Sequence, residues 1–128
     1  MIQEGAFSDL TKYNIFNLTN AIQARDLNEI SRILSSKMEI DPLALTSLLY
    51  QNFRKMIVVW FDKNPTPDST GLKSNQIWAI RNLPRYYNKD QLIQIFKFLT
   101  TLDLKLKKGE LPKIEDLTSY IVGKILTF

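Results

Sequence analysis

The chain of 128 residues contains no cysteine and no histidine. It therefore has no disulfide framework, no thiol nucleophile, no imidazole base, and no conventional zinc or haem site. Its four glycines are scattered singly, so no glycine-rich loop is present to bind phosphates. These absences argue against most hydrolases, metalloenzymes and nucleotide-binding proteins, and they predict a chain with no catalytic residues, cofactor or metal of its own.

Long apolar runs are also missing. The sequence contains no run of 18 apolar residues, the length needed to span a membrane. The opening MIQEGAFSDL lacks the basic and apolar regions of a signal peptide. We therefore expect a cytoplasmic protein that does not contact a membrane. With 45% hydrophobic and 23% charged residues, the composition is ordinary for one globular domain that buries a core.

Charge is distributed unevenly along the chain. Residues 1–62 carry six Lys/Arg and seven Asp/Glu, while residues 63–128 carry eleven and six, which gives net charges of −1 and +5. The basic second half is compatible with a nucleic acid or an acidic partner. A pI near 9.3 is nevertheless common among proteins that bind neither, and charge by itself favours such a protein.

Helical periodicity extends through nearly the whole chain and predicts an all-α fold. Six helices are expected, at about residues 11–25, 27–37, 43–62, 74–84, 88–108 and 112–128. Capping residues mark four of the starts, namely Asp26, Asp41, Ser74 and Asn88. The third helix has too many apolar residues for one narrow stripe, so it should lie at the centre. Residues 64–71, NPTPDSTG, are expected to be a loop without regular structure.

Two pairs of carboxylates could in principle provide an acid and a base. They are Asp26 with Glu29 and Glu115 with Asp116. Both pairs fall in the first turn of a predicted helix, where acidic side chains stabilise the helix dipole. Helix capping is therefore strongly favoured over catalysis.

The segment 103–109, DLKLKKG, combines a buried acid with a helix end. Asp103 lies on the apolar stripe of the fifth helix, where a carboxylate needs an ionic or hydrogen-bonding partner. Lys107, Arg54 and Arg81 are the candidate partners, and we favour a structural ion pair with Arg54 because its helix should pack against the fifth. Removing one member of a buried pair costs on the order of 3–5 kcal/mol.

The residues after Asp103 predict where this helix ends. Lys105, Lys107 and Lys108 gather in the last turn, where cations favour the helix dipole, and Gly109 suits the C′ position. This basic turn is a candidate surface for an anionic partner.

The segment 78–87, WAIRNLPRYY, interleaves aromatic residues with Arg81 and Arg85, a composition that can stack on bases and neutralise phosphates. Aromatic residues at helical spacing more often belong to a core, and that interpretation is favoured. The candidate DNA-proximal residues are Trp78, Arg81, Lys105, Lys107 and Lys108.

Four segments resemble, in order, the C-terminal collar domain of the delta subunit of DNA polymerase III, a component of the bacterial clamp loader. They are Tyr13-Asn14-Ile15-Phe16-Asn17-Leu18 with Ala21-Ile22 and Arg25-Asp26 after it, Leu48-Leu49 with Phe53-Arg54, Arg85-Tyr86-Tyr87, and DLKLKKG. The last is the most similar, with Asp103, Leu104, Lys107 and Gly109 all in place.

The resemblance implies a five- to six-helix bundle of the clamp-loader collar type at residues 11–128. Residues 1–10 would be a tail joined to AAA+-like domains that precede this chain. The collar would assemble with the delta prime and the gamma or tau subunits. It would approach primed DNA through the assembled complex, and only the AAA+-like part would bind the sliding clamp. The parent protein would belong to the DNA polymerase III holoenzyme, a nucleotidyltransferase, without this chain being catalytic.

Two alternatives are the collar domain of another clamp-loader subunit and a sequence-tolerant nucleic-acid-binding domain. The second would use the 64–71 loop and the fourth helix as a helix-turn-helix-like unit. An assembly domain should expose an apolar patch of several hundred Å². A nucleic-acid-binding domain should instead show a clustered positive face and salt-dependent binding.

Overall fold

The computed structural model describes residues 4–36, 39–110 and 114–128, and all regular structure in these ranges is helical. The helices are α1 (Glu4–Gln23), α2 (Leu27–Ser35), α3 (Pro42–Trp60), α4 (Pro67–Thr70), α5 (Ser74–Arg81), α6 (Lys89–Lys107) and α7 (Leu117–Thr127). The predicted all-α class is confirmed. Seven helices are found in the described ranges, against the five or six expected.

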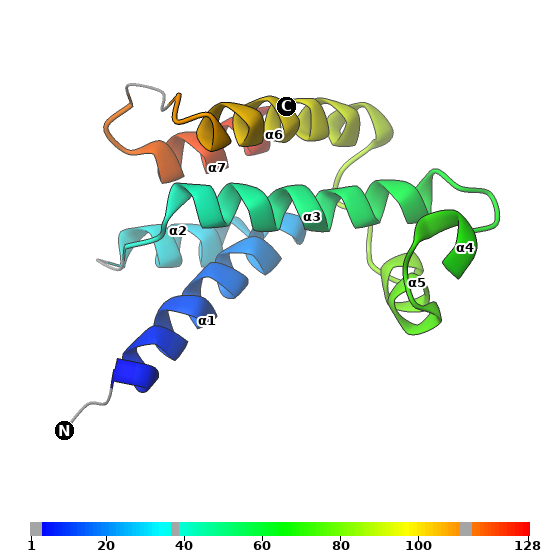
Figure 1. The fold of residues 1–128 in the computed structure, drawn as a ribbon, viewed down its shortest axis with the longest axis horizontal. Helices are drawn as coiled ribbons and strands as arrows, with labels where there is room; N and C mark the ends of the chain where they lie inside the picture. Colours follow the sequence, from blue (N-terminus) through cyan, green and yellow to red (C-terminus); the bar gives the residue numbers. More distant parts are fainter. Residues whose placement is uncertain (1–3, 37–38, 111–113) are drawn as a thin grey trace.

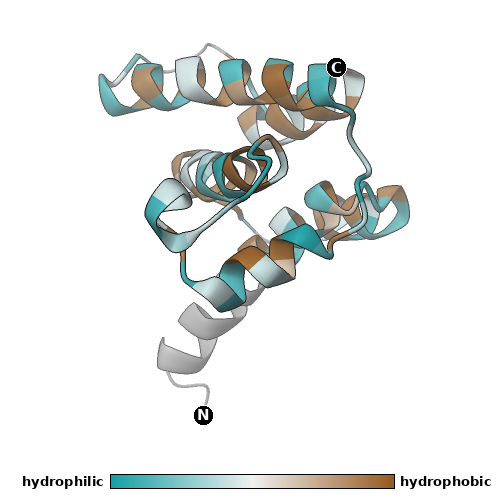
Figure 2. Ribbon diagram, turned by 90° about the vertical axis from the view of Figure 1, so that its right-hand side faces the viewer, coloured by the Kyte–Doolittle hydropathy of each residue, from teal (hydrophilic) through white to brown (hydrophobic). Residues whose placement is uncertain are grey.

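Helix α3 is the central element, as its sequence predicts. It contacts α1, α4, α5, α6 and α7. Figure 1 shows α6 on one side of α3, α1 and α2 on the other, and α4 and α5 together at its C-terminal end. Brown apolar segments alternate with teal polar ones along the helices in Figure 2, as expected for helices with one buried face.

Three of the predicted helix starts have the expected caps. The side chains of Asp26 and Asp41 each accept a hydrogen bond of 3.2 Å from a backbone N–H in the first turn of α2 and α3. At the start of α6, Asn88 and Gln91 form a reciprocal capping box, with both hydrogen bonds at 2.8 Å. Polar side chains near these helix starts thus satisfy N–H groups that lack helical partners.

The expectation of an irregular loop at 64–71 is wrong for half of its residues, because α4 forms one helical turn there. Thr66 and Ser69 make a capping box through hydrogen bonds of 2.9 and 3.0 Å. Pro67 occupies the first helical position, where its missing N–H costs nothing. Gly71 ends the turn in the left-handed conformation, with φ of +74°.

One helix begins earlier than predicted, and another has a different N-cap residue. Helix α1 begins at Glu4 rather than Thr11, so residues 4–10 of the expected tail are helical. For α5, the N-cap is Lys73 and not Ser74, because the Lys73 N–H is bound by the Gln76 side chain at 3.0 Å. The capping role given to Ser74 is therefore wrong by one residue.

Helix α7 begins at Leu117, five residues after the predicted start at Pro112, which lies outside the described residues. Asp116 caps it by accepting hydrogen bonds from the Ser119 N–H at 3.1 Å and the Ser119 hydroxyl at 2.8 Å. These bonds hold the pKa of the Asp116 carboxyl below its usual value. The capping interpretation of this carboxylate is confirmed.

Helices α1 and α6 end in the same hydrogen-bonding pattern. A residue with positive φ, Arg25 (+53°) or Gly109 (+74°), donates its N–H to the carbonyl three residues earlier at 3.1 Å. The following N–H bonds the carbonyl five residues earlier at 2.9 Å, which completes a Schellman motif. The predicted C′ role of Gly109 is confirmed. Arg25 holds this conformation without being a glycine, and its guanidinium reaches the Leu126 carbonyl at 3.3 Å.

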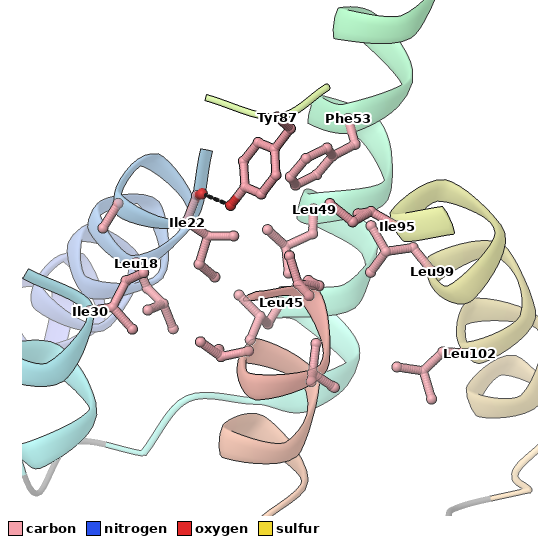
Figure 3. Packing of buried hydrophobic residues seen from close by; sticks show 14 of the residues in the cluster. Leu18, Ile22, Ile30, Leu45, Leu49, Phe53, Tyr87, Ile95, Leu99 and Leu102 are labelled. Atoms are coloured by element: carbon pink, nitrogen blue, oxygen red, sulfur yellow. Dashed lines mark hydrogen bonds between the residues drawn. The ribbon is translucent and has the colours of Figure 1, made fainter. Parts of the chain in front are cut away.

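The apolar interior divides into two clusters of unequal size. The main core joins α1, α2, α3, α6 and α7 (Figure 3). Its fully buried members include Leu18, Ile22, Ile33, Leu45, Leu49, Phe53, Ile95, Leu99, Ile121 and Ile125. A second cluster of Val59, Leu72 and Ile77 fastens residues 64–83, which we call the distal arm, to the end of α3.

Tyr87 connects the segment after the distal arm to the main core. Its hydroxyl donates a hydrogen bond to the Ile22 carbonyl (Figure 3), and its ring packs edge-on against Phe53 at 5.7 Å. Burial raises the pKa of Tyr87 to about 12, although the nearby Arg25 guanidinium acts in the opposite direction. The path of the chain between α5 and α6 is therefore set by a buried side chain.

Candidate functional site

Asp103 is buried, as its place on the apolar stripe predicts, but its partner is not the favoured one. Its Oδ2 lies 2.8 Å from Lys107 Nζ, one helical turn on, and Ser47 donates a long hydrogen bond of 3.4 Å to Oδ1. Arg54 is exposed, and although both residues are described, it forms no ion pair with Asp103. Asp103 therefore fixes the end of α6 from within the helix.

The ion pair of Asp103 is less buried than the sequence suggests. The Lys107 side chain is 63% exposed, and its hydrogen bond to Asp103 raises its pKa. Water solvates an exposed ammonium in the absence of its carboxylate, so the penalty typical of a buried pair does not apply here. The ion pair therefore lies at the surface, with the Lys107 side chain in solvent and the Asp103 carboxylate shielded from it.

The candidate DNA-proximal residues do not share one surface. The basic turn follows Asp103, which lies beside Ser47 near the start of α3. The distal arm is instead fastened at the end of α3, where Trp60 Nε1 donates to the Ile80 carbonyl at 2.8 Å. The 13 residues from Ser47 to Trp60 span about 20 Å of helix. The end of α6, which carries the three lysines, and helix α5, which carries Trp78, thus lie at opposite ends of α3 (Figure 1).

The aromatic residues of segment 78–87 divide between surface and core. Trp78 is 69% exposed and lies with Arg81 beside a depression between α4 and α5. Tyr86 is 47% exposed, whereas Tyr87 is buried. The interpretation of these aromatics as core residues is therefore right only for Tyr87.

A hollow forms where the end of α3, the segment after α5 and the start of α6 meet. Its volume is about 420 Å³, and it is lined by Trp60, Phe61, Arg85, Tyr86, Tyr87, Asn88, Lys89, Gln91 and Leu92. We call it the aromatic hollow. Phe61 and Tyr86 present 40% and 47% of their surfaces to solvent. Among the described residues that line it, none is acidic.

Both cations of the aromatic hollow lie over aromatic rings. The Arg85 guanidinium carbon is 5.1 Å from the centre of the Trp60 ring, and Lys89 Nζ is 5.3 Å from the centre of the Phe61 ring. Within the described ranges neither cation forms an ion pair with a carboxylate. Their charge is therefore available to an anionic group.

Only part of this site is evident from the sequence. The segment 78–87 indicates Arg85, but no sequence pattern associates Phe61 or Lys89 with a binding surface. These two are 28 positions apart, and only the packing of α6 against α3 brings them together. One sequence feature does indicate an exposed aromatic residue here. Trp60 and Phe61 are adjacent at a helix end, so they cannot both lie on one buried stripe.

A second, mainly apolar surface lies between α1 and α3. We call it the α1–α3 groove, and its lining residues are Ile15, Phe16, Ala44, Ser47, Leu48 and Gln51. Phe16 is 53% exposed, and Leu43 nearby on α3 is 41% exposed. Exposed large apolar residues in a groove are typical of a surface that is covered by another protein.

No group of three or more acidic side chains in the described ranges is placed to hold a metal ion. Of the helices described, none is long and apolar enough to cross a membrane. The two surfaces defined above are therefore the features from which a function can be argued.

Comparisons with protein-family models, with curated proteins and with solved structures find no match to this chain. Support for a function therefore comes from the aromatic hollow, the α1–α3 groove and the segments that line them.

Proposed function

We propose that this chain is an assembly domain of the clamp-loader collar type, equivalent to the C-terminal domain of the DNA polymerase III delta subunit. In this proposal it joins the delta prime and the gamma or tau subunits in a ring that places the sliding clamp on primed DNA. The chain contributes no catalysis, and it approaches primed DNA through the assembled complex. The observation that carries the proposal is the α1–α3 groove with its exposed Phe16.

The segments that resemble the delta-subunit collar supply this groove. Ile15 and Phe16 belong to the first of them, and Leu48 belongs to the second. Ser47, which also lines the groove, donates a hydrogen bond to Asp103 of the segment DLKLKKG. Two of the segments thus line one surface, and the third contacts one of its lining residues from the interior, which supports a shared role for them.

The chemistry of the groove suits a partner helix or loop with apolar side chains. Aromatic anchors near the centre of an interface contribute a large part of the binding energy. Phe16 is half exposed, and removing it from water would contribute hydrophobic free energy in proportion to the apolar area buried. We therefore expect Phe16 to be the main anchor of the assembly surface.

Co-purification with the delta prime and gamma or tau subunits of the same genome tests this proposal. We expect the chain to bind at least one of them, and Phe16→Ser to weaken that binding roughly 30-fold, as is typical of a hot-spot residue. Leu27→Ser is the matched control, because Leu27 is 58% exposed on α2, outside the groove. Absence of binding by the unaltered chain, or equal losses in both variants, would refute the proposal.

The two alternatives are separated by different observations. A helix-turn-helix function is not favoured, because α4 has only four residues and cannot serve as the first helix of such a unit. The collar of another loader subunit is distinguished by reconstitution, since a delta-type collar should fill one position in the ring and should not replace gamma.

A further inference from the structure

We infer that the aromatic hollow binds single-stranded DNA by stacking bases on Phe61 and Tyr86 and by placing phosphates near Arg85 and Lys89. This site lies at the end of α3 distant from the basic turn, and it differs from the assembly surface. The inference does not depend on the proposed function, because it concerns other residues and is tested on the chain alone.

Exposed rings and unpaired cations occur together in the hollow. Phe61 and Tyr86 are both at least 40% exposed, although they lie beside buried residues such as Leu92. Arg85 and Lys89 lie over rings that line the same hollow, at 5.1 and 5.3 Å. Stacking surfaces beside positive charges are the combination that single-stranded nucleic acids require.

Two rings beside the proposed stacking residues are held in place by hydrogen bonds, and the backbone of a third residue is fixed. Tyr87 is anchored to the main core through the Ile22 carbonyl, and Trp60 is anchored through the Ile80 carbonyl at 2.8 Å. Phe61 itself is the C-cap residue of α3, and its N–H bonds the Ile57 carbonyl. A ligand would therefore meet a preformed surface and would not have to order a loop on binding.

The polar lining favours stacking over reading of base edges. Asn88 Oδ1 and Gln91 Oε1 already accept the capping-box hydrogen bonds of α6. Gln91 Nε2 donates to the Phe128 carbonyl at 3.1 Å. Because these acceptors are engaged in helix capping, they are poorly placed to read base edges, and binding should tolerate many sequences.

Fluorescence anisotropy of a labelled oligo(dT) of about 12 nucleotides tests the inference on the 128-residue chain. We expect saturable binding at low salt. With two cations in contact with phosphates, log K should fall with log salt at a slope of about −1.4. Replacing both cations, by Arg85→Gln with Lys89→Gln, should bring the slope close to zero.

Matched substitutions on α7 provide the control. There, Tyr120 is 41% exposed, and Lys124 lies 5.4 Å from the Phe128 ring centre, which is the same chemistry outside the hollow. Tyr86→Ala should weaken oligo(dT) binding about ten-fold. Tyr120→Ala and Lys124→Gln should leave it unchanged, and circular dichroism should show that all variants are folded.

Several outcomes would overturn the inference. One is the absence of saturable oligo(dT) binding at low salt. Another is an equal loss in the Tyr86→Ala and Tyr120→Ala variants, which would mean that the contact is not at the hollow. Tighter binding of a duplex of the same length would exclude stacking, and tighter binding of oligo(U) would exclude the assignment to DNA. Binding of a labelled acidic peptide that unlabelled oligo(dT) does not displace would identify a protein partner instead.

Discussion

The two ends of α3 differ in how much apolar surface surrounds them. The N-terminal and middle parts pack into the main core, which draws on five helices and Tyr87. The C-terminal end holds the distal arm through three buried residues, Val59, Leu72 and Ile77. The heavily packed end fixes the fold. At the lightly packed end, large aromatic side chains such as Trp78 and Phe61 stay exposed and available for binding.

Trp60 connects the main core with the distal arm. It packs against both apolar clusters, and its indole N–H donates a hydrogen bond to the Ile80 carbonyl near the end of α5. The same ring forms one wall of the aromatic hollow. The hollow is therefore located at the boundary between a rigid core and a less stable element, where binding surfaces often occur.

The largest effect should come from Phe53→Ala in the main core. Phe53 is fully buried and packs against Tyr87, so the variant should lose about 3–5 kcal/mol of unfolding free energy. Urea denaturation followed by circular dichroism measures this loss. A loss below about 1 kcal/mol would show that the packing around Phe53 is not as dense as its burial indicates.

Ile77→Ala should instead act on the distal arm. Ile77 is 6% exposed in a cluster of three residues, and we expect a loss of about 2 kcal/mol that falls mainly on local opening. Hydrogen exchange should accelerate roughly 30-fold in α5 and little in the main core. If the urea midpoint fell as far as in Phe53→Ala, arm and core would form one cooperative unit.

Tyr87→Phe tests the connection between the main core and the segment that follows the distal arm. Losing the hydrogen bond to the buried Ile22 carbonyl should cost about 1–2 kcal/mol at neutral pH. The pKa of Tyr87 is about 12 in the folded chain and about 10 when unfolded, so the unfolded state ionises first as pH rises. The stability contribution of the neutral phenol is therefore complete below pH 10 and is lost between pH 10 and 12.

This pH dependence gives the measurement for Tyr87. Between pH 10 and 12 the difference in unfolding free energy between the unaltered chain and Tyr87→Phe should decrease, because the variant has no phenol to ionise. Denaturation curves of both proteins between pH 8 and 12 measure the difference. A constant difference across this window would mean that the Tyr87 hydroxyl is solvated in the folded state.

Asp103→Asn should have the smallest effect, because Lys107 is largely exposed. We expect a small decrease in melting temperature at low salt and almost none at high salt, since screening weakens surface ion pairs. Lys107→Gln is the comparison substitution and should give a larger decrease, because it leaves the buried Asp103 carboxylate with the long hydrogen bond from Ser47. A large decrease for Asp103→Asn that persists at high salt would restore the idea of a buried ion pair.

Local signals explain most of what the sequence predicts correctly. Asp26, Asp41 and Asn88 cap helices, and Gly109 ends one, because each acts through hydrogen bonds within a few residues. The same local rules mislead at Pro67, which is compatible with irregular structure and with a first helical position alike. A choice between the two depends on packing against α3.

Tertiary structure decides which candidate pairs with Asp103, although Lys107 is a local candidate one helical turn away, and it decides which residue meets Phe61. Arg54 was favoured for Asp103 because its helix packs against α6, yet on α3 it points to solvent and the carboxylate turns to Lys107 on its own helix. Lys89 meets Phe61 only after two helices have packed. Side-chain direction and contacts between distant segments follow from the tertiary structure, and no short pattern records them.

The position of the two tryptophans has a spectroscopic consequence. The chain contains only Trp60 and Trp78, and both belong to the boundary and the distal arm, while the aromatic side chains of the main core are Phe and Tyr. Intrinsic tryptophan emission therefore reports on one end of α3, and far-ultraviolet ellipticity reports on all the helices. A shift in emission at a denaturant concentration where ellipticity is unchanged would record the arm detaching from an intact core.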